Sequence, residues 1–82
     1  MDELLSTKQV AWVLDRSPGT IRDMIREGVI EGVRIPAGFR IPKGEALRLA
    51  RERIETEAGR KVSDRELERL IDKVITTNEE HE

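Results

Sequence analysis

The spacing of apolar residues along the chain predicts four helices and one β-hairpin. Apolar positions that recur three and four residues apart indicate a helix with one buried face. This spacing occurs over residues 7–14, 18–27, 43–58 and 64–76. Residues 32–35 and 39–41 instead alternate in the manner of strands, and Pro36-Ala37-Gly38 supplies turn residues between them. The predicted fold class is therefore mainly α with a small β-hairpin.

Capping signals set the ends of these helices. Ser6 with Gln9 forms a capping box, in which each side chain bonds the backbone amide of the other residue, and Ser63 with Glu66 repeats it. Ser17 is the expected cap of the second helix. Glycines directly follow the second and third helices and are expected to end them. Because only three or four residues join the first two helices, these are expected to form a helix-turn-helix arrangement.

The same spacing predicts which residues of the last two helices face inward. They are Leu47, Ala50, Ile54 and Ala58 in the third helix, and Leu67, Leu70, Ile71, Val74 and Ile75 in the fourth. The apolar face of the fourth helix has two possible covers, the rest of the same chain or a second copy. Trp12 is expected to cover the edge of the core, and Phe39 to anchor the hairpin on the helices. A contact with a partner is the alternative for both aromatic residues.

Composition argues against catalysis and metal binding. The 82 residues include no cysteine and a single histidine, His81. Disulfides, thiolate nucleophiles and cysteine or histidine metal sites are therefore excluded. Carboxylates are abundant, but no acid, base and nucleophile stand together. We expect a protein that is not an enzyme and needs no cofactor or metal.

Two further absences bear on the expected location. No apolar stretch approaches the ~20 residues that span a bilayer. The first residues are acidic and do not form the basic and then apolar segment of a signal peptide. A cytoplasmic protein is therefore expected.

Charge is unevenly distributed, although the formal net charge is only −2. Residues 16–43 hold six basic and three acidic side chains, which give a net charge of +3. Residues 51–82 hold seven basic and ten acidic side chains, which give −3. An anionic partner, such as nucleic acid, is therefore expected to contact the first stretch and not the second.

The candidate DNA contacts lie on the second helix and on the hairpin. The side of the second helix opposite its apolar face carries Arg22, Asp23 and Arg26, and arginine forks bind guanine or phosphate. The start of that helix offers backbone amides suited to a phosphate. Arg34 and Arg40 are expected to project to one side of the hairpin. The complete candidate set is Ser17, Gly19, Thr20, Arg22, Asp23, Arg26, Arg34, Arg40 and Lys43. The alternative is that these charges only pair with one another on a solvated surface.

Residues 4–49 together resemble the winged helix-turn-helix of the excisionase and MerR-type proteins. The segment from Leu4 to Ala11 is similar to the opening of that fold, and the segment from Ser17 to Gly28 to its second helix. Val33-Arg34-Ile35 and Phe39-Arg40-Ile41-Pro42 resemble its wing, and Glu45-Ala46-Leu47 its following helix. In its small size the chain is similar to the excisionases, or recombination directionality factors, of phages and mobile elements.

This resemblance implies a sequence-specific DNA-binding and DNA-bending accessory protein that directs a partner integrase toward excision in a bacterial host. It also implies cooperative loading on adjacent DNA sites, for which residues 60–76 are the candidate contact between copies. The expected organisation is a winged helix-turn-helix domain over residues 1–50, a helical extension over 51–77 and a polar tail over 78–82.

Two other functions fit the same sequence. The first is a small MerR-like transcriptional regulator that uses the same fold without an integrase. The second is a protein-interaction or antitoxin-type module, which the acidic total charge favours and which would use the apolar stripe of the fourth helix. Salt-dependent binding to duplex DNA separates the second from the DNA-binding functions.

Overall fold

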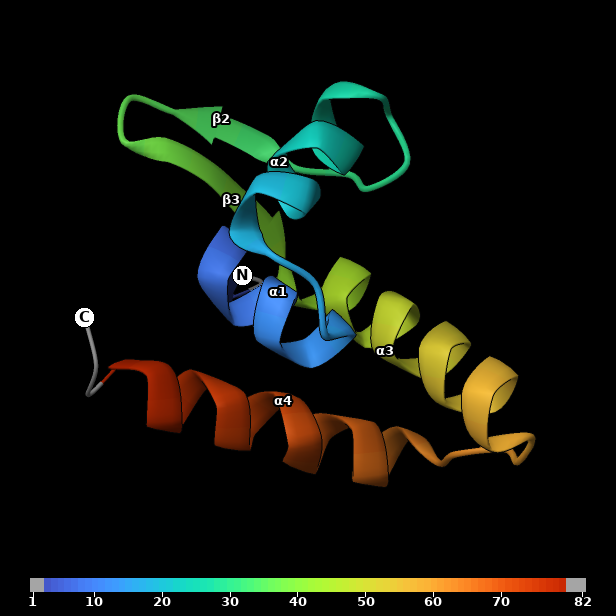
Figure 1. Cartoon of the computed structure of the whole chain (residues 1–82). Helices are drawn as coiled ribbons and strands as arrows, with labels where there is room; N and C mark the ends of the chain where they lie inside the picture. The colour runs from blue at the N-terminus through green and yellow to red at the C-terminus, as the bar shows by residue number, and fades with distance from the viewer. Residues whose placement is uncertain (1–2, 80–82) are drawn as a thin grey trace.

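The computed structural model of the protein describes residues 3–79, and their side chains as far as residue 76 (Figure 1). It is mainly helical with one small antiparallel sheet. Its elements are β1 (Leu4–Ser6), α1 (Thr7–Leu14), α2 (Pro18–Arg26), β2 (Val33–Ile35), β3 (Gly38–Pro42), α3 (Lys43–Ala58) and α4 (Asp64–Glu79). The predicted fold class is confirmed at this level, and three of the four predicted helices match to within a residue.

The sheet contains one strand more than the sequence predicted. β3 lies in the centre, between β1 and β2, and pairs antiparallel with both. The added strand, β1, places Leu5 opposite Ile41, and both side chains are fully buried. β1 continues directly into α1, because Ser6 is both the last residue of the strand and the cap of the helix. The hairpin is thereby tied to the first helix through backbone hydrogen bonds.

The predicted caps of the first two helices are present. Ser6 Oγ accepts the backbone N–H of Gln9, and Gln9 Oε1 accepts the backbone N–H of Ser6, which completes the capping box. Ser17 Oγ accepts the backbone N–H of Thr20 at 3.1 Å. The three residues between α1 and α2 begin with Asp15, whose positive φ of 56° turns the chain. After this turn α2 packs against α1, and the cap by Ser17 holds the first turn of α2.

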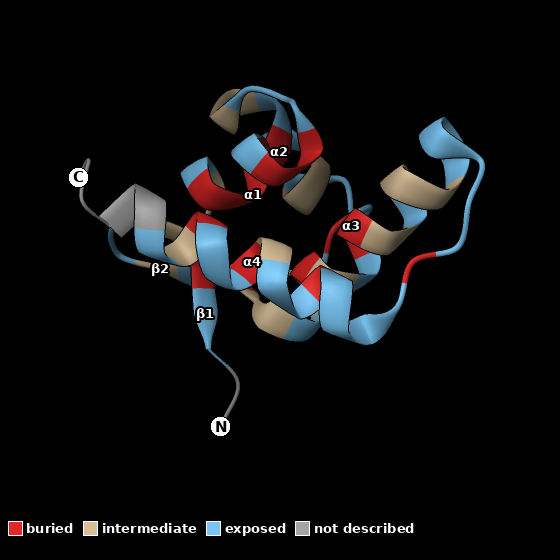
Figure 2. Cartoon of the chain, turned by 90° about the horizontal axis from the view of Figure 1, so that it is seen from below, coloured by how far each residue is buried: buried red, intermediate tan, exposed pale blue. Residues whose placement is uncertain are grey.

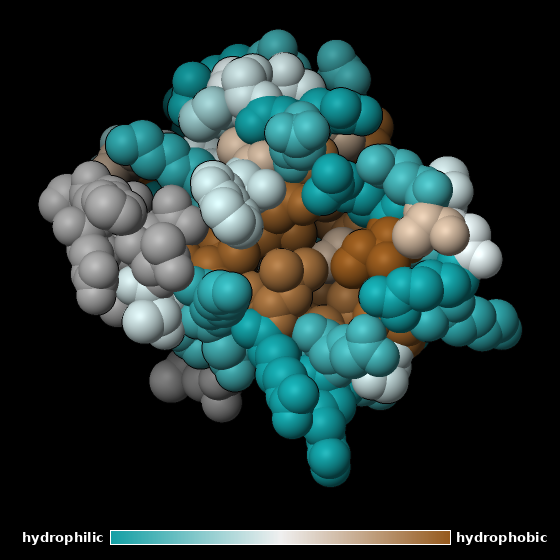
Figure 3. Space-filling view, turned by 60° about the horizontal axis from the view of Figure 1, so that its bottom comes forward, coloured by the Kyte–Doolittle hydropathy of each residue, from teal (hydrophilic) through white to brown (hydrophobic). Residues whose placement is uncertain are grey.

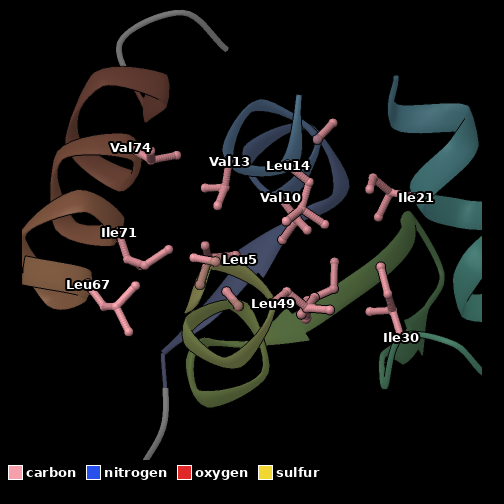
Figure 4. Packing of buried hydrophobic residues seen from close by; sticks show 14 of the residues in the cluster. Leu5, Val10, Val13, Leu14, Ile21, Ile30, Leu49, Leu67, Ile71 and Val74 are labelled. Atoms are coloured by element: carbon pink, nitrogen blue, oxygen red, sulfur yellow. The ribbon is translucent and has the colours of Figure 1, made fainter. Parts of the chain in front are cut away.

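One continuous core joins the sheet and all four helices. Figure 4 shows side chains of α4 pointing toward Val13 of α1 and Leu5 of β1. Leu67, Ile71 and Val74 are at most 1 % exposed. The apolar face of α4 is therefore covered by its own chain in this structure, which is the first of the two covers that the sequence left open. In the burial view of Figure 2 the buried residues of α4 lie against the rest of the molecule, and its outer side is exposed.

Three expectations about the helices are wrong in detail. Trp12 does not cover the core and is 63 % exposed, because its side of α1 faces away from every neighbouring helix and the sheet. Ala58 is also exposed, as are Thr56 and Glu57 before it, so the last turn of α3 does not contribute to the core. α4 continues to Glu79, so the first two residues of the predicted tail are helical, and residues 80–82 lie outside the described residues.

The buried face of α3 is also shifted from the predicted one. Ala46, Leu49 and Ala50 are buried, whereas Leu47 and Ile54 are only partly buried. The face turns because α3 packs on β3, α1 and α4 at once. Within residues 3–79, no helix has the length and apolar character needed to cross a membrane.

Candidate nucleic-acid interface

The first turn of α2 holds the three small candidate residues. Ser17 caps the helix, and its hydroxyl lies 2.9 Å from that of Thr20. A Cβ on Gly19 would lie 3.8 Å from Nη2 of Arg22, so the guanidinium of Arg22 lies close to the backbone of this turn. One cation and two hydroxyls thus gather at the end of the helix where the dipole is positive.

The exposed side of α2 carries the two predicted arginines and the predicted aspartate. Ile21 is fully buried, which turns Arg22, Asp23 and Arg26 outward as the spacing predicted. Arg26 Nη1 donates to Asp23 Oδ1 at 3.3 Å. The Cζ atom of Arg26 also lies 5.9 Å from the ring centroid of Phe39 on β3, within cation–π range. Arg26 is therefore held by contacts on two different elements.

The β2–β3 hairpin faces this side of α2. Arg34 lies directly opposite Phe39 in the strand register, so both side chains are on the same face of the sheet. Residues of the hairpin and of α2 surround one hollow of about 500 Å³. Its lining is Arg22, Arg26, Arg34, Ile35, Pro36, Gly38 and Phe39. We call this the α2–hairpin groove; three of its seven residues are arginines.

The expectation that Arg34 and Arg40 project to one side is wrong. Arg40 pairs with Val33 and Arg34 with Phe39, and successive side chains of a strand alternate between faces. Arg40 therefore lies on the outer face of the sheet, where its Nη1 donates to the backbone oxygen of Phe39 at 2.9 Å. It is outside the α2–hairpin groove.

Lys43 is also separated from the groove. Its Nζ donates to Asp72 Oδ1 on α4 at 3.0 Å. This hydrogen bond raises the pKa of Lys43, and the charge of the same carboxylate adds to the effect. The lysine thus connects the start of α3 to α4. Of the nine candidates, the structure brings Arg22, Asp23, Arg26 and Arg34 together, places Ser17, Gly19 and Thr20 at the start of α2, and puts Arg40 and Lys43 elsewhere.

Phe39 is the residue whose place the sequence reasoning missed. It is partly exposed and is not among the side chains packed on the core, so it does not anchor the hairpin in the predicted way. It forms part of the groove beneath Arg26 instead. The alternation of β3 places Phe39 on the same face as the buried Ile41, but only the pairing of Arg34 with Phe39 across the sheet brings it beside the arginines of the groove. That pairing depends on the register of the hairpin, which no local signal fixed.

The described helices also border hollows away from this groove. One of about 220 Å³ is bordered by Leu14, Met24, Leu49 and Arg53 among others, and one of about 360 Å³ lies between α3 and α4. Figure 3 brings α4 forward and shows apolar side chains gathered in a depression with hydrophilic side chains around it. Neither hollow is lined by arginines from α2 and the hairpin together.

Comparisons with protein-family models, with curated proteins and with solved structures give no match to this chain.

Proposed function

We propose that this protein binds double-stranded DNA through the α2–hairpin groove and the first turn of α2. The observation that carries the proposal is the convergence of Arg22, Arg26 and Arg34 from two separate elements around one hollow. Neither Arg22 nor Arg34 forms an ion pair with another residue in the described part of the chain. Their charges are therefore available to an anionic partner.

The dimensions of the two elements agree with this use. A helix of the length of α2 (nine residues) is about 14 Å long, and a helix with its side chains fits the ~12 Å major groove of B-DNA. The hairpin extends beyond the helices beside α2 (Figure 1), so it can reach the adjacent backbone or minor groove. Together they form a winged helix-turn-helix in this proposal.

The decisive measurement is duplex binding as a function of salt concentration, with a labelled random-sequence duplex and fluorescence anisotropy. A protein that neutralises about five phosphates gives a log–log slope of about −4 to −5. Arg22→Ala and Arg34→Ala are each expected to make the slope less steep by about 0.9. Arg65→Ala removes an equal charge from an exposed residue of α4 and serves as the matched control.

Two results would reject the proposal at different levels. No salt-dependent binding at low ionic strength would exclude DNA as the partner. Equal effects of Arg22→Ala and Arg65→Ala would show that DNA binding does not use α2.

The resemblance extends the proposal to recombination. In this extension the protein loads side by side on adjacent sites, bends the duplex and directs an integrase toward excision. Bending a site costs on the order of 1–6 kcal/mol, which the added protein–DNA contacts must offset. Excision by the cognate integrase with and without the protein tests this role. A small transcriptional regulator would bind the same DNA and leave excision unchanged.

A further inference from the structure

The position of Arg26 differs from that of the other two arginines of the groove. Its guanidinium is bound by Asp23 at 3.3 Å and lies 5.9 Å from the ring centroid of Phe39. For Arg22 and Arg34, no hydrogen bond or ion pair to another described residue is present. The pair with Asp23 is weak by itself, because both side chains are about two-thirds exposed, but together with the ring it favours one orientation of Arg26. Arg22 and Arg34 have no such contacts.

Geometry limits what the oriented arginine can still do. Asp23 takes one hydrogen of Nη1, and no other described residue accepts from Arg26. The Nη2 and Nε edge therefore remains available, and two parallel donors on one edge match the O6 and N7 acceptors of guanine. A phosphate can be bound by a mobile arginine, whereas a base edge demands a fixed plane and direction.

We infer that Arg26 reads a guanine in the major groove and that Asp23 and Phe39 are its positioning residues, while Arg22 and Arg34 bind phosphate. This division of roles rests on the proposed DNA binding. In this inference Phe39, an aromatic residue of the hairpin, contributes to sequence specificity by orienting Arg26 on the helix. It also gives a role to Asp23, the carboxylate that stands among three cations and whose charge by itself repels DNA.

Replacing Asp23 is expected to have an effect on DNA binding that partial unfolding of the protein would not produce. Replacing Asp23 by asparagine removes a negative charge from the interface, so binding to DNA of any sequence is expected to become tighter. The same change releases Arg26, so the preference for guanine is expected to fall. Overall affinity and specificity thus move in opposite directions.

The experiment begins by selecting the preferred duplex of the full chain from a random-sequence library. Each guanine of that duplex is then replaced in turn by 7-deazaguanine, which removes N7 and keeps the base pair. The ratio of the two dissociation constants measures how strongly that guanine is read. For the wild type, one position is expected to show a ratio of about 5- to 150-fold, and Arg26→Ala is expected to abolish it.

The positioning residues are tested on the same pair of duplexes. Phe39→Leu removes the ring and is expected to lower the ratio about 2- to 5-fold, while Phe39→Tyr retains the ring and is expected to keep it. Asp23→Asn is expected to lower the ratio and to tighten binding to a random duplex. Arg34→Ala, the control, is expected to weaken binding to both duplexes equally. Far-UV circular dichroism checks that each variant is folded.

The inference is overturned if no guanine replacement affects the wild type, or if Phe39→Leu and Asp23→Asn retain its full ratio. It is also overturned if Arg34→Ala, and not Arg26→Ala, removes the ratio. In each of these cases the protein still binds DNA with a salt-dependent affinity. Absence of any such binding is a different result, which rejects the proposed function itself.

Discussion

Glu45, in the first turn of α3, connects the segment between α2 and β2 to the helical body. Its side chain is only 9 % exposed. Its Oε2 accepts a hydrogen bond from the backbone N–H of Glu31 at 2.9 Å. Arg48 donates from Nε to Oε1 at 2.8 Å and from Nη2 to Oε2 at 2.9 Å. Because Glu31 lies between the helix and the hairpin that form the groove, this carboxylate helps to fix their relative position.

Replacing Glu45 by alanine is expected to lower the free energy of unfolding by about 1–3 kcal/mol. Hydrogen bonds to charged groups contribute about 1.5–3 kcal/mol each, and solvent can replace part of this at the exposed backbone of Glu31. Glu45→Gln keeps an acceptor for that N–H and is expected to cost less, about 1 kcal/mol. Urea unfolding followed by far-UV circular dichroism measures all three proteins.

Glu52 provides the matched control for this prediction. It also pairs with Arg48, at 3.3 Å, but its side chain is 69 % exposed. Removing it is expected to change stability by less than about 0.5 kcal/mol, as is usual for exposed ion pairs. If Glu45→Ala is as mild as Glu52→Ala, the carboxylate does not hold the segment in place and the reasoning is refuted.

The contribution of Glu45 is also expected to depend on pH. The hydrogen bond from Arg48 lowers the pKa of Glu45 below its ordinary value of 4.5, the N–H of Glu31 adds to this, and burial acts in the opposite direction. A carboxylate with a lowered pKa stabilises the folded state fully above its ordinary pKa, and this is lost as pH falls through the lowered value. The stability difference between wild type and Glu45→Gln should therefore be constant near neutral pH and shrink below about pH 4.5. A difference that persists at low pH would contradict the assignment.

Three further predictions concern stability and use the same unfolding measurement. Ile71→Ala is expected to cost about 2–5 kcal/mol, because the side chain is fully buried between α4 and the core, and a cost below 1 kcal/mol would show that α4 does not pack in this way. Trp12→Ala is expected to change stability by less than about 0.5 kcal/mol, since the ring is exposed, whereas a packed tryptophan would cost about 3–5 kcal/mol. Ser17→Ala is expected to cost about 1 kcal/mol through loss of the cap of α2, and Ser17→Thr, which keeps a hydroxyl, should restore most of it.

The helices could be predicted because their signals are local. Ser6, Ser17 and Gly59 each act within one turn of the residues they cap or end, so no information about the rest of the fold is needed. The three-residue strand β1 could not be predicted in this way. This strand forms through its pairing with β3, in which Leu5 lies opposite Ile41, and these residues are far apart in the chain.

The hairpin was predicted correctly as an element, but its turn was predicted one residue too long, and this changes which residues line the site. The sequence placed three residues in the turn, which would set Arg34 opposite Arg40. In the structure Ile35 pairs with Gly38, so the loop has two residues and Arg34 lies opposite Phe39. Gly38 permits this because its φ is +136°, a conformation that other residues rarely adopt. A shift of one residue between the strands therefore places Arg34 on the face of Phe39 and not on that of Arg40, which is why Phe39 and not Arg40 lines the groove.

The formal net charge of −2 does not show which cations are available to a partner. That depends on which of them form ion pairs within the chain. Arg48, Arg51 and Arg53 of α3 each bind a carboxylate of the same helix. Before such an arginine can neutralise a phosphate it must lose its present partner, so it adds little to DNA affinity. Arg22 and Arg34 carry the same formal charge without an ion pair to a described residue. An acidic protein can therefore present a face that attracts DNA, because the acidic residues of α3 neutralise the cations beside them, whereas Arg22 and Arg34 of the groove have no such partner.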